Sequence, residues 1–303
     1  MKKRIIGTAG NASGDRLLVA IGATHGNELE GVHALRRVFT KLRAHRIRVT
    51  GYFVGLHGNL QAIKAQRRYL GHDLNRIWQE PHLTRMSTDE LPEYAEMRDL
   101  RRLLLGYRPE VRERAVLLDL HTTSSPNGTF WVGMPTSDVN LMRHAGAPII
   151  HGLHEIAGLP GTTTVYFGER GYASHALEGG QHGTEQAVWN LEATLWKTLE
   201  YLGMVPEGTY AAVAERDSTM HKLCQAGVPQ ELSFAYRHEI GPEEEFRSVP
   251  GLANFQFINK GTLLAHNDEG GVRAPRDGYL LMPLYQDEGS DGYFLVEPTQ
   301  ADL

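Results

Sequence analysis

The chain has 303 residues, 41% of them hydrophobic, and a formal net charge of -5 at pH 7, values that are ordinary for a globular protein. This mild acidity gives no bulk attraction to nucleic acid, and no run approaches the roughly 18 uninterrupted apolar residues of a membrane-spanning helix. The basic N-terminus lacks the apolar core of a signal peptide. We therefore expect a cytoplasmic protein without nucleic-acid or membrane partners.

Predicted strands and helices alternate through the first two thirds of the chain. The apolar run Arg16–Ile21 has the character of a buried strand, and Glu28–Leu42 carries apolar residues at helical spacing after Asn27, which can cap that helix. The polar stretch Gln61–Trp78 is expected to be a long loop with helical pieces. Further strands are predicted over Ile47–Leu56, Ala115–Leu120, Phe130–Val132, Ile149–His151 and Val165–Phe167, and further helices over Tyr94–Leu105 and Thr184–Leu202. This alternation predicts an α/β fold with a mixed, largely parallel sheet flanked by helices.

The pattern changes past Gly203. Short apolar runs alternate there with Gly, Pro and Asp turns, without a strong helical pattern; the runs are Phe255–Ile258, Thr262–Ala265, Tyr279–Met282 and Tyr293–Val296. We expect a small all-β C-terminal domain over residues 206–303, following an α/β catalytic domain over residues 1–205.

Histidines are abundant and cysteine is scarce. The chain contains fifteen histidines but a single cysteine, Cys224, which can form neither an internal disulfide nor a cysteine-rich zinc site. Any metal site therefore has to be built from imidazole and carboxylate groups.

Polar residues follow the first predicted strand. His25 and Glu28 are three residues apart at the expected start of the helix, where both side chains can converge on one point. An imidazole nitrogen and a carboxylate oxygen are an ordinary pair of zinc ligands. The alternative is a turn histidine and a glutamate that complements the helix dipole, and the spacing by itself favours this simpler alternative.

A second polar group ends the predicted strand Ala115–Leu120. His121 can supply a third metal ligand, and Asp119 lies on the same strand face, where it can orient a ligand or satisfy a turn. Two histidines and one glutamate leave zinc an open position for water, as in catalytic sites. The alternative is a strand-end histidine that bonds to nearby backbone.

Two further segments carry charged groups. The loop around Arg68, Asn75 and Arg76 interleaves guanidinium and amide groups, which suit a carboxylate and an amide carbonyl, although such basic runs are usually solvated. Glu178 precedes glycines and the long predicted helix. A carboxylate beside an activated water can take its proton and return it to a leaving amine. The alternative for Glu178 is a favourable position against the helix dipole.

Four segments, in the same order, resemble the aspartoacylase/succinylglutamate desuccinylase family, relatives of the zinc carboxypeptidases. They are Gly22–Val32, Arg68–Ile77, Asp119–Gly128 and Leu177–Gly183. The resemblance implies one zinc ion per chain, held by His25, Glu28 and His121.

The resemblance also implies roles for the remaining polar residues. Arg68 would polarise the scissile acyl carbonyl, and Glu178 would act as general base and then general acid. The residues that would bind the substrate are Asn75, Arg76, Arg170 and Tyr285. The spacing around Arg170 departs from the family pattern, and Tyr285 lies in a loosely matching C-terminal region.

These implications predict a zinc-dependent amidohydrolase whose small-molecule substrate is an N-acyl amino acid. A peptidase of the zinc carboxypeptidase type is one alternative, since it would use the same zinc core. A non-catalytic ligand-binding relative is a weaker alternative, because it should lack a ligand or the base. A homo-oligomer is compatible with this prediction.

Overall fold

The structure is a computed structural model that describes residues 4–85, 91–155, 161–214, 227–241 and 243–299. Cys224 lies outside these ranges. The described helices are α1 (Glu30–Ala44), α2 (Leu60–Ala65), α3 (His82–Arg85), α4 (Pro92–Leu105), α5 (Pro109–Arg112), α6 (Val139–Ala145), α7 (Thr163–Gly168), α8 (Glu185–Tyr201) and α9 (Thr209–Val213). None of the described helices is both long and apolar enough to cross a bilayer.

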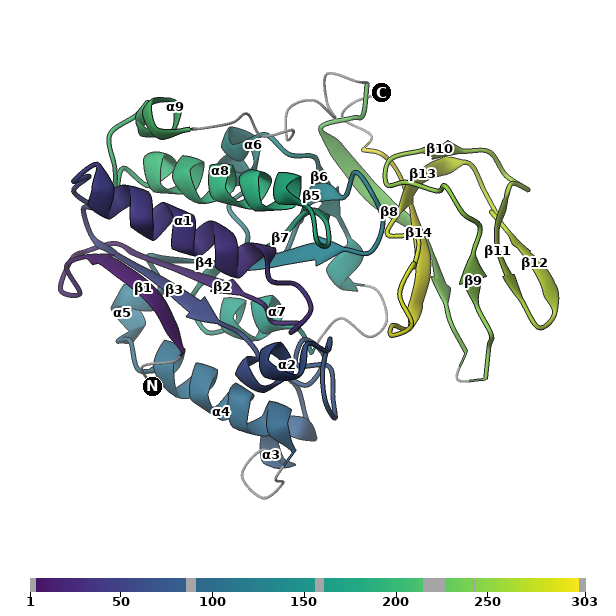
Figure 1. Cartoon of the computed structure of the whole chain (residues 1–303), viewed down its shortest axis with the longest axis horizontal. Coiled ribbons are helices and arrows are strands. Elements are labelled where there is room, and N and C mark those ends of the chain that lie inside the picture. Colours follow the sequence, from purple (N-terminus) through teal and green to yellow (C-terminus); the bar gives the residue numbers. More distant parts are fainter. Residues whose placement is uncertain (1–3, 86–90, 156–160, 215–226, 242, 300–303) are drawn as a thin grey trace.

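The strands form two sheets (Figure 1). The larger contains β1 (Ile5–Gly10), β2 (Leu17–Gly22), β3 (Tyr52–His57), β4 (Ala115–Thr123), β5 (Thr129–Val132), β6 (Ile149–His151), β7 (Ala173–Gln181), β8 (Glu231–Glu239), β10 (Phe257–Ile258), β13 (Gly278–Leu281) and β14 (Asp291–Pro298). The smaller contains β9 (Arg247–Ser248), β11 (Leu263–Asn267) and β12 (Gly270–Arg273). The larger sheet has the order β1-β3-β2-β4-β7-β5-β6-β8-β14-β13-β10, and the central strands β3, β2, β4 and β7 are parallel. The predicted fold class is therefore confirmed.

Strand β2 is buried along its whole length because helices cover both faces of the sheet (Figure 1). Leu18 and Ala20 pack into the cluster formed with α1 and α8. Leu17, Val19 and Ile21 pack into the opposite cluster, with α4 and α7. This alternation follows from the two-residue period of a strand, and burial on both faces explains the continuous apolar run.

The carboxyl ends of β2, β4 and β7 meet at one edge of the sheet. Gly22 of β2 lies opposite Leu120 of β4, and His121 of β4 lies opposite Glu178 of β7. The chain continues from β2 to β3 on one side, whereas β4 lies on the other side. Open α/β sheets place their ligand sites where the strand order reverses in this way.

The prediction of a strand at Val165–Phe167 is wrong, because this segment lies in helix α7. The Thr162 side chain caps the helix by accepting the Val165 N–H. The aromatic rings of Tyr166 and Phe167 pack against Trp78, with ring centroids 5.0 and 5.1 Å away. Local capping and aromatic packing thus outweigh the β-propensity of the sequence.

The predicted starts of one helix and one strand also differ from those in the structure. Helix α1 begins at Glu30 with Leu29 at its N-cap position, so Asn27 is not its cap, and no side chain in the described part of the chain caps this helix. Strand β3 begins at Tyr52 rather than Ile47, because the Ile47 N–H bonds to Leu42 at the end of α1.

The C-terminal strands continue the larger sheet. Strand β8 pairs in parallel with β6, and β14, β13 and β10 follow in antiparallel order. Strands β9, β11 and β12 form the small antiparallel sheet. The β-rich C-terminal region is confirmed, whereas the domain boundary near residue 205 stays a prediction.

Candidate metal centre and active site

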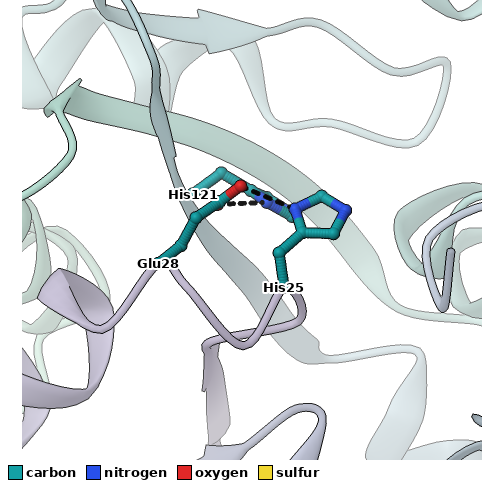
Figure 2. A group of neighbouring side chains, drawn as sticks. All are labelled: His25, Glu28 and His121. Atoms are coloured by element: carbon teal, nitrogen blue, oxygen red, sulfur yellow. Dashed lines mark hydrogen bonds and ion pairs between the residues drawn. The ribbon is translucent and has the colours of Figure 1, made fainter. Parts of the chain in front are cut away.

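The three predicted metal ligands converge at the carboxyl ends of β2 and β4 (Figure 2). Nδ1 of His25 lies 2.7 Å from Oε1 of Glu28, and Nδ1 of His121 lies 3.1 Å from Oε2. One ligand atom from each residue lies within 4.8 Å of the others, and all three side chains are buried. Two imidazole nitrogens and a carboxylate form the ligand set of a catalytic zinc site.

Close packing of α1 against the sheet positions this group. A Cβ atom on Gly31 would lie 2.9 Å from the Cβ of Leu120 and 3.1 Å from the Cα of Gly22, so only glycine fits without a shift. The Glu28 N–H bonds to the His25 carbonyl over 3.1 Å. His25 and Glu28 therefore converge in the turn before α1, and not in its first turn as the spacing predicted.

Carboxylates lie against the outer nitrogens of both imidazole rings. Nε2 of His25 is 3.0 Å from Asp73, and Nε2 of His121 is 3.1 Å from Asp119. The Thr24 hydroxyl donates to the other Asp119 oxygen over 2.6 Å. Such partners fix the ring orientation and make the inner nitrogens better metal ligands. Asp119 occupies the position that its strand face predicted, whereas Asp73 comes from a loop and was not predicted.

The charges around the metal position favour a cation. Burial alone would raise the pKa of Glu28, but His25 and His121 lower it well below its usual value. Burial would also raise the pKa of Asp73, which His25 lowers overall. Burial lowers the pKa of His121, but Asp119 and Glu28 raise it well above its usual value. Three carboxylates around two imidazoles thus fit a divalent metal ion.

Arg68 joins the loop after α2 to this centre. Its Nη1 lies 3.0 Å from Glu28 and its Nη2 lies 3.5 Å from Asp73. Its main-chain carbonyl accepts the Gly26 N–H over 3.0 Å, which ties the two loops together. Burial lowers the pKa of Arg68, but the adjacent carboxylates raise it overall, so the guanidinium stays charged.

Glu178 lies in the interior of β7, beside His121 of β4. Its Oε2 is buried and has no hydrogen-bond partner among the described residues. Burial is the main reason that the pKa of Glu178 rises to about 7, with a further contribution from Glu28. A carboxyl group with a pKa near neutrality can both accept and return a proton.

One cavity of about 950 Å³, which includes the part open to solvent, is lined by the side chains of His25, Glu28, Arg68, His121 and Glu178. Asn75 and Arg76 also line it. The Asn75 side-chain oxygen accepts the Thr163 N–H over 2.9 Å, and Arg76 lies 3.6 Å from Asp291. The cavity therefore brings together the predicted metal ligands, the predicted catalytic residues Arg68 and Glu178, and two of the four predicted substrate-binding residues.

The structure does not bring Arg170 and Tyr285 to this cavity. Arg170 donates to the Tyr166 carbonyl over 2.8 Å, and its guanidinium lies 3.6 Å from the centre of the Tyr166 ring. The Tyr285 hydroxyl donates to the Val249 carbonyl over 2.6 Å and accepts the Leu252 N–H over 2.8 Å. Neither side chain lines the cavity, so the geometry gives no support to their predicted roles.

A group of hydrogen-bonded polar residues also reaches the cavity, and these contacts were not predicted from the sequence. The Thr122 hydroxyl lies 2.7 Å from Nδ1 of His182 and 3.3 Å from Glu30. Glu30 also accepts the Gly183 N–H over 2.7 Å. Nε2 of His182 is buried without a partner among the described residues. No sequence spacing links these residues, because they come from α1, β4 and the turn after β7.

Comparisons with known proteins point to one family. The model of the succinylglutamate desuccinylase/aspartoacylase catalytic domain matches residues 13–170. A human N-acyl-aromatic-L-amino acid amidohydrolase (carboxylate-forming) is 33% identical over 133 residues, which are 43% of this chain and 41% of that protein. This chain thus matches about two fifths of the length of that relative.

Two longer similarities agree with this match. Succinylglutamate desuccinylase from Pseudoalteromonas atlantica is 22% identical over 300 residues, covering 90% of this chain and 78% of that protein. The crystal structure of succinylglutamate desuccinylase from Vibrio cholerae superposes with a TM-score of 0.68 at 17% identity, covering 94% of this chain and 82% of that one. The latter similarity establishes a shared fold.

Proposed function

Because the chain belongs to the succinylglutamate desuccinylase/aspartoacylase family, we propose that it is a zinc-dependent amidohydrolase that cleaves an N-acyl amino acid. The observation that carries the proposal is that the buried group His25, Glu28 and His121 shares one cavity with Glu178, whose Oε2 has no hydrogen-bond partner among the described residues. By their names, the relatives act on N-acyl aromatic amino acids and on succinylglutamate, and both are N-acyl amino acids.

His25, Glu28 and His121 would hold the metal, since their nitrogen and oxygen atoms already converge and their charges favour a cation. When bound, a zinc ion supplies Lewis-acid chemistry, which polarises a carbonyl oxygen and makes a water molecule more acidic. Asp73 and Asp119 would keep the two imidazole rings in orientation.

Glu178 would move the proton of the reaction. Its carboxylate takes a proton from the attacking water and returns it to the nitrogen of the leaving amino acid. The raised pKa, at about 7, suits both steps. Arg68 would donate hydrogen bonds to the acyl oxygen as negative charge develops there, and Asn75 with Arg76 would bind the substrate carboxylate.

Hydrolysis assays on the zinc-loaded protein test this proposal. We expect release of free amino acid from an N-acyl amino acid, loss of the activity after metal removal with a chelator, and recovery on adding zinc. Hydrolysis that survives complete metal removal would contradict the proposal. Faster cleavage of a blocked dipeptide than of any N-acyl amino acid would instead favour the carboxypeptidase-type alternative. The cytoplasmic location and a homo-oligomeric state stay predictions.

A further inference from the structure

One wall of the cavity is apolar. Ala176 and Glu178 are two residues apart on β7, so both face the same side of the sheet. The wall therefore begins roughly 7 Å along the strand from the proposed base. Ala176 is paired with Val132 of the neighbouring strand β5. The wall continues through residues of other segments, Met134, Leu153, Leu284 and Phe294.

Part of this wall is the surface of a packed core. Leu153 and Phe294 are 1% and 3% exposed, and they belong to one buried cluster with Phe130 and Ile150. Val132 packs against the same cluster. The apolar side chains of this wall offer no hydrogen bond, so a charged substrate group placed against them would lose hydration without gaining a bond to them, which is unfavourable.

The cavity has few cations that could bind additional carboxylates. Apart from histidines, the cationic side chains among the described lining residues are Arg68 and Arg76. Arg68 already lies 3.0 Å from Glu28 and faces the metal position. The Arg76 side chain is 30% exposed, its Nη1 donates to the Asn75 carbonyl over 2.9 Å, and its Nη2 lies 3.6 Å from Asp291. A guanidinium carries five N–H donors, so Arg76 can still bind one substrate carboxylate.

We propose that the substrate carries a single carboxylate and an apolar remaining group, in contrast to the N-acyl derivatives of acidic amino acids. This inference rests on the proposed function. Arg76 would bind the carboxylate, and the apolar wall would bury either the amino-acid side chain or the acyl group.

A panel of four compounds tests this substrate class. N-acetyl-L-phenylalanine and N-benzoylglycine carry one carboxylate, with the apolar group on the amino-acid side or on the acyl side. N-acetyl-L-aspartate and N-succinyl-L-glutamate carry additional carboxylates. We expect kcat/KM to be at least about tenfold higher for one of the first two, and the better of that pair shows which group lies on the wall. Equal or faster hydrolysis of either acidic compound would overturn the inference.

A charge introduced on the wall gives a second test. Leu284→Arg changes a half-buried lining residue in the segment before β14. We expect it to shift the ratio of kcat/KM values toward N-acetyl-L-aspartate by about tenfold or more. Phe257→Arg is the matched control, because Phe257 is 55% exposed on β10 and lies outside the cavity. An unchanged ratio in the Leu284 variant would contradict a substrate contact with the wall.

Binding measurements separate this inference from the proposed function. If none of the four compounds is hydrolysed, the proposed function is contradicted. Calorimetric titration of the zinc-loaded Glu178→Gln protein with the same four compounds then still ranks them by binding affinity. Tighter binding of the apolar monocarboxylates supports the inference, and tighter binding of the acidic compounds, or no binding, overturns it.

Discussion

Asp119 contacts the proposed metal centre through His121, whose outer nitrogen lies 3.1 Å from the carboxylate. Asparagine has nearly the same volume but lacks the charge that raises the pKa of His121. We expect Asp119→Asn to weaken zinc binding by about 10–100-fold, as measured by competition with a chromophoric chelator. Asp138→Asn is the control, because Asp138 caps α6 and asparagine caps a helix equally well. Equal zinc affinities in both variants would show that Asp119 does not support the ligand.

His175 makes the stability of the protein sensitive to acid. Its Nε2 accepts the Asp138 N–H over 2.9 Å, and its Nδ1 lies 3.1 Å from the Ala173 carbonyl, so the buried ring is neutral. Burial lowers the pKa of His175 from 6.5 to about 4. Below pH 6.5 the unfolded chain binds a proton that the folded protein does not bind, so stability falls as the pH falls toward 4.

We expect this group to remove about 2 kcal/mol from the free energy of unfolding between pH 7 and pH 5. The free energy of unfolding of the His175→Gln variant should fall by less over the same pH interval, because glutamine does not titrate and can make both hydrogen bonds. Denaturant unfolding of both proteins at the two pH values measures the difference. Identical losses would mean that His175 does not titrate as its environment predicts.

The close packing of helix α1 against the sheet holds Glu28 in position. A Cβ atom on Gly31 would lie 2.9 Å from the Cβ of Leu120. Gly31→Ala should push the start of α1 away from the sheet, lower stability by about 1–3 kcal/mol and weaken zinc binding through Glu28. Gly241→Ala is the control, because its Cβ would meet ordinary contacts at 3.8 Å. Denaturant unfolding measures the stability and zinc titration measures the zinc affinity. A Gly31→Ala variant with the stability and zinc affinity of the control would contradict the role of this contact.

The strands that carry the site were predictable to different degrees. Strands β2 and β4 are buried on both faces, so their continuous apolar runs identify them in the sequence. Strand β7 mixes small, polar and glycine residues, and it is a strand because it pairs with β4 and β5. The proposed metal ligands His25, Glu28 and His121 follow apolar runs, but their spacing by itself favoured a simpler alternative, and the resemblance of four segments to the family supplied the ligand set. Asp73 and His182 lie in segments that resemble the family, but their contacts with His25 and Thr122 were not predictable, because tertiary packing brings these partners together.

Distant parts of the chain build one cavity. The proposed metal ligands follow β2 and lie near the end of β4, whereas Leu284, Asp291 and Phe294 belong to the C-terminal region in and before β14. Figure 1 shows that β14 is far from β2 in the sequence. Hydrophobic periodicity predicted a β-rich C-terminal region but not its strand partners. Because β8 pairs with β6, the C-terminal strands β8 and β14 join the larger sheet. This pairing places Asp291 and Phe294 of β14 at the cavity.

Exchange of Glu178 for glutamine tests most directly whether the Glu178 carboxyl group moves the proton during hydrolysis. We expect Glu178→Gln to keep its zinc, as measured by metal analysis, and to lose hydrolysis of its best N-acyl amino acid by roughly 10²–10⁴-fold. Glu185→Gln is the matched control, because Glu185 is exposed in the first turn of α8. A zinc-loaded Glu178→Gln enzyme that hydrolyses its substrate at the rate of the control would contradict the proposed mechanism.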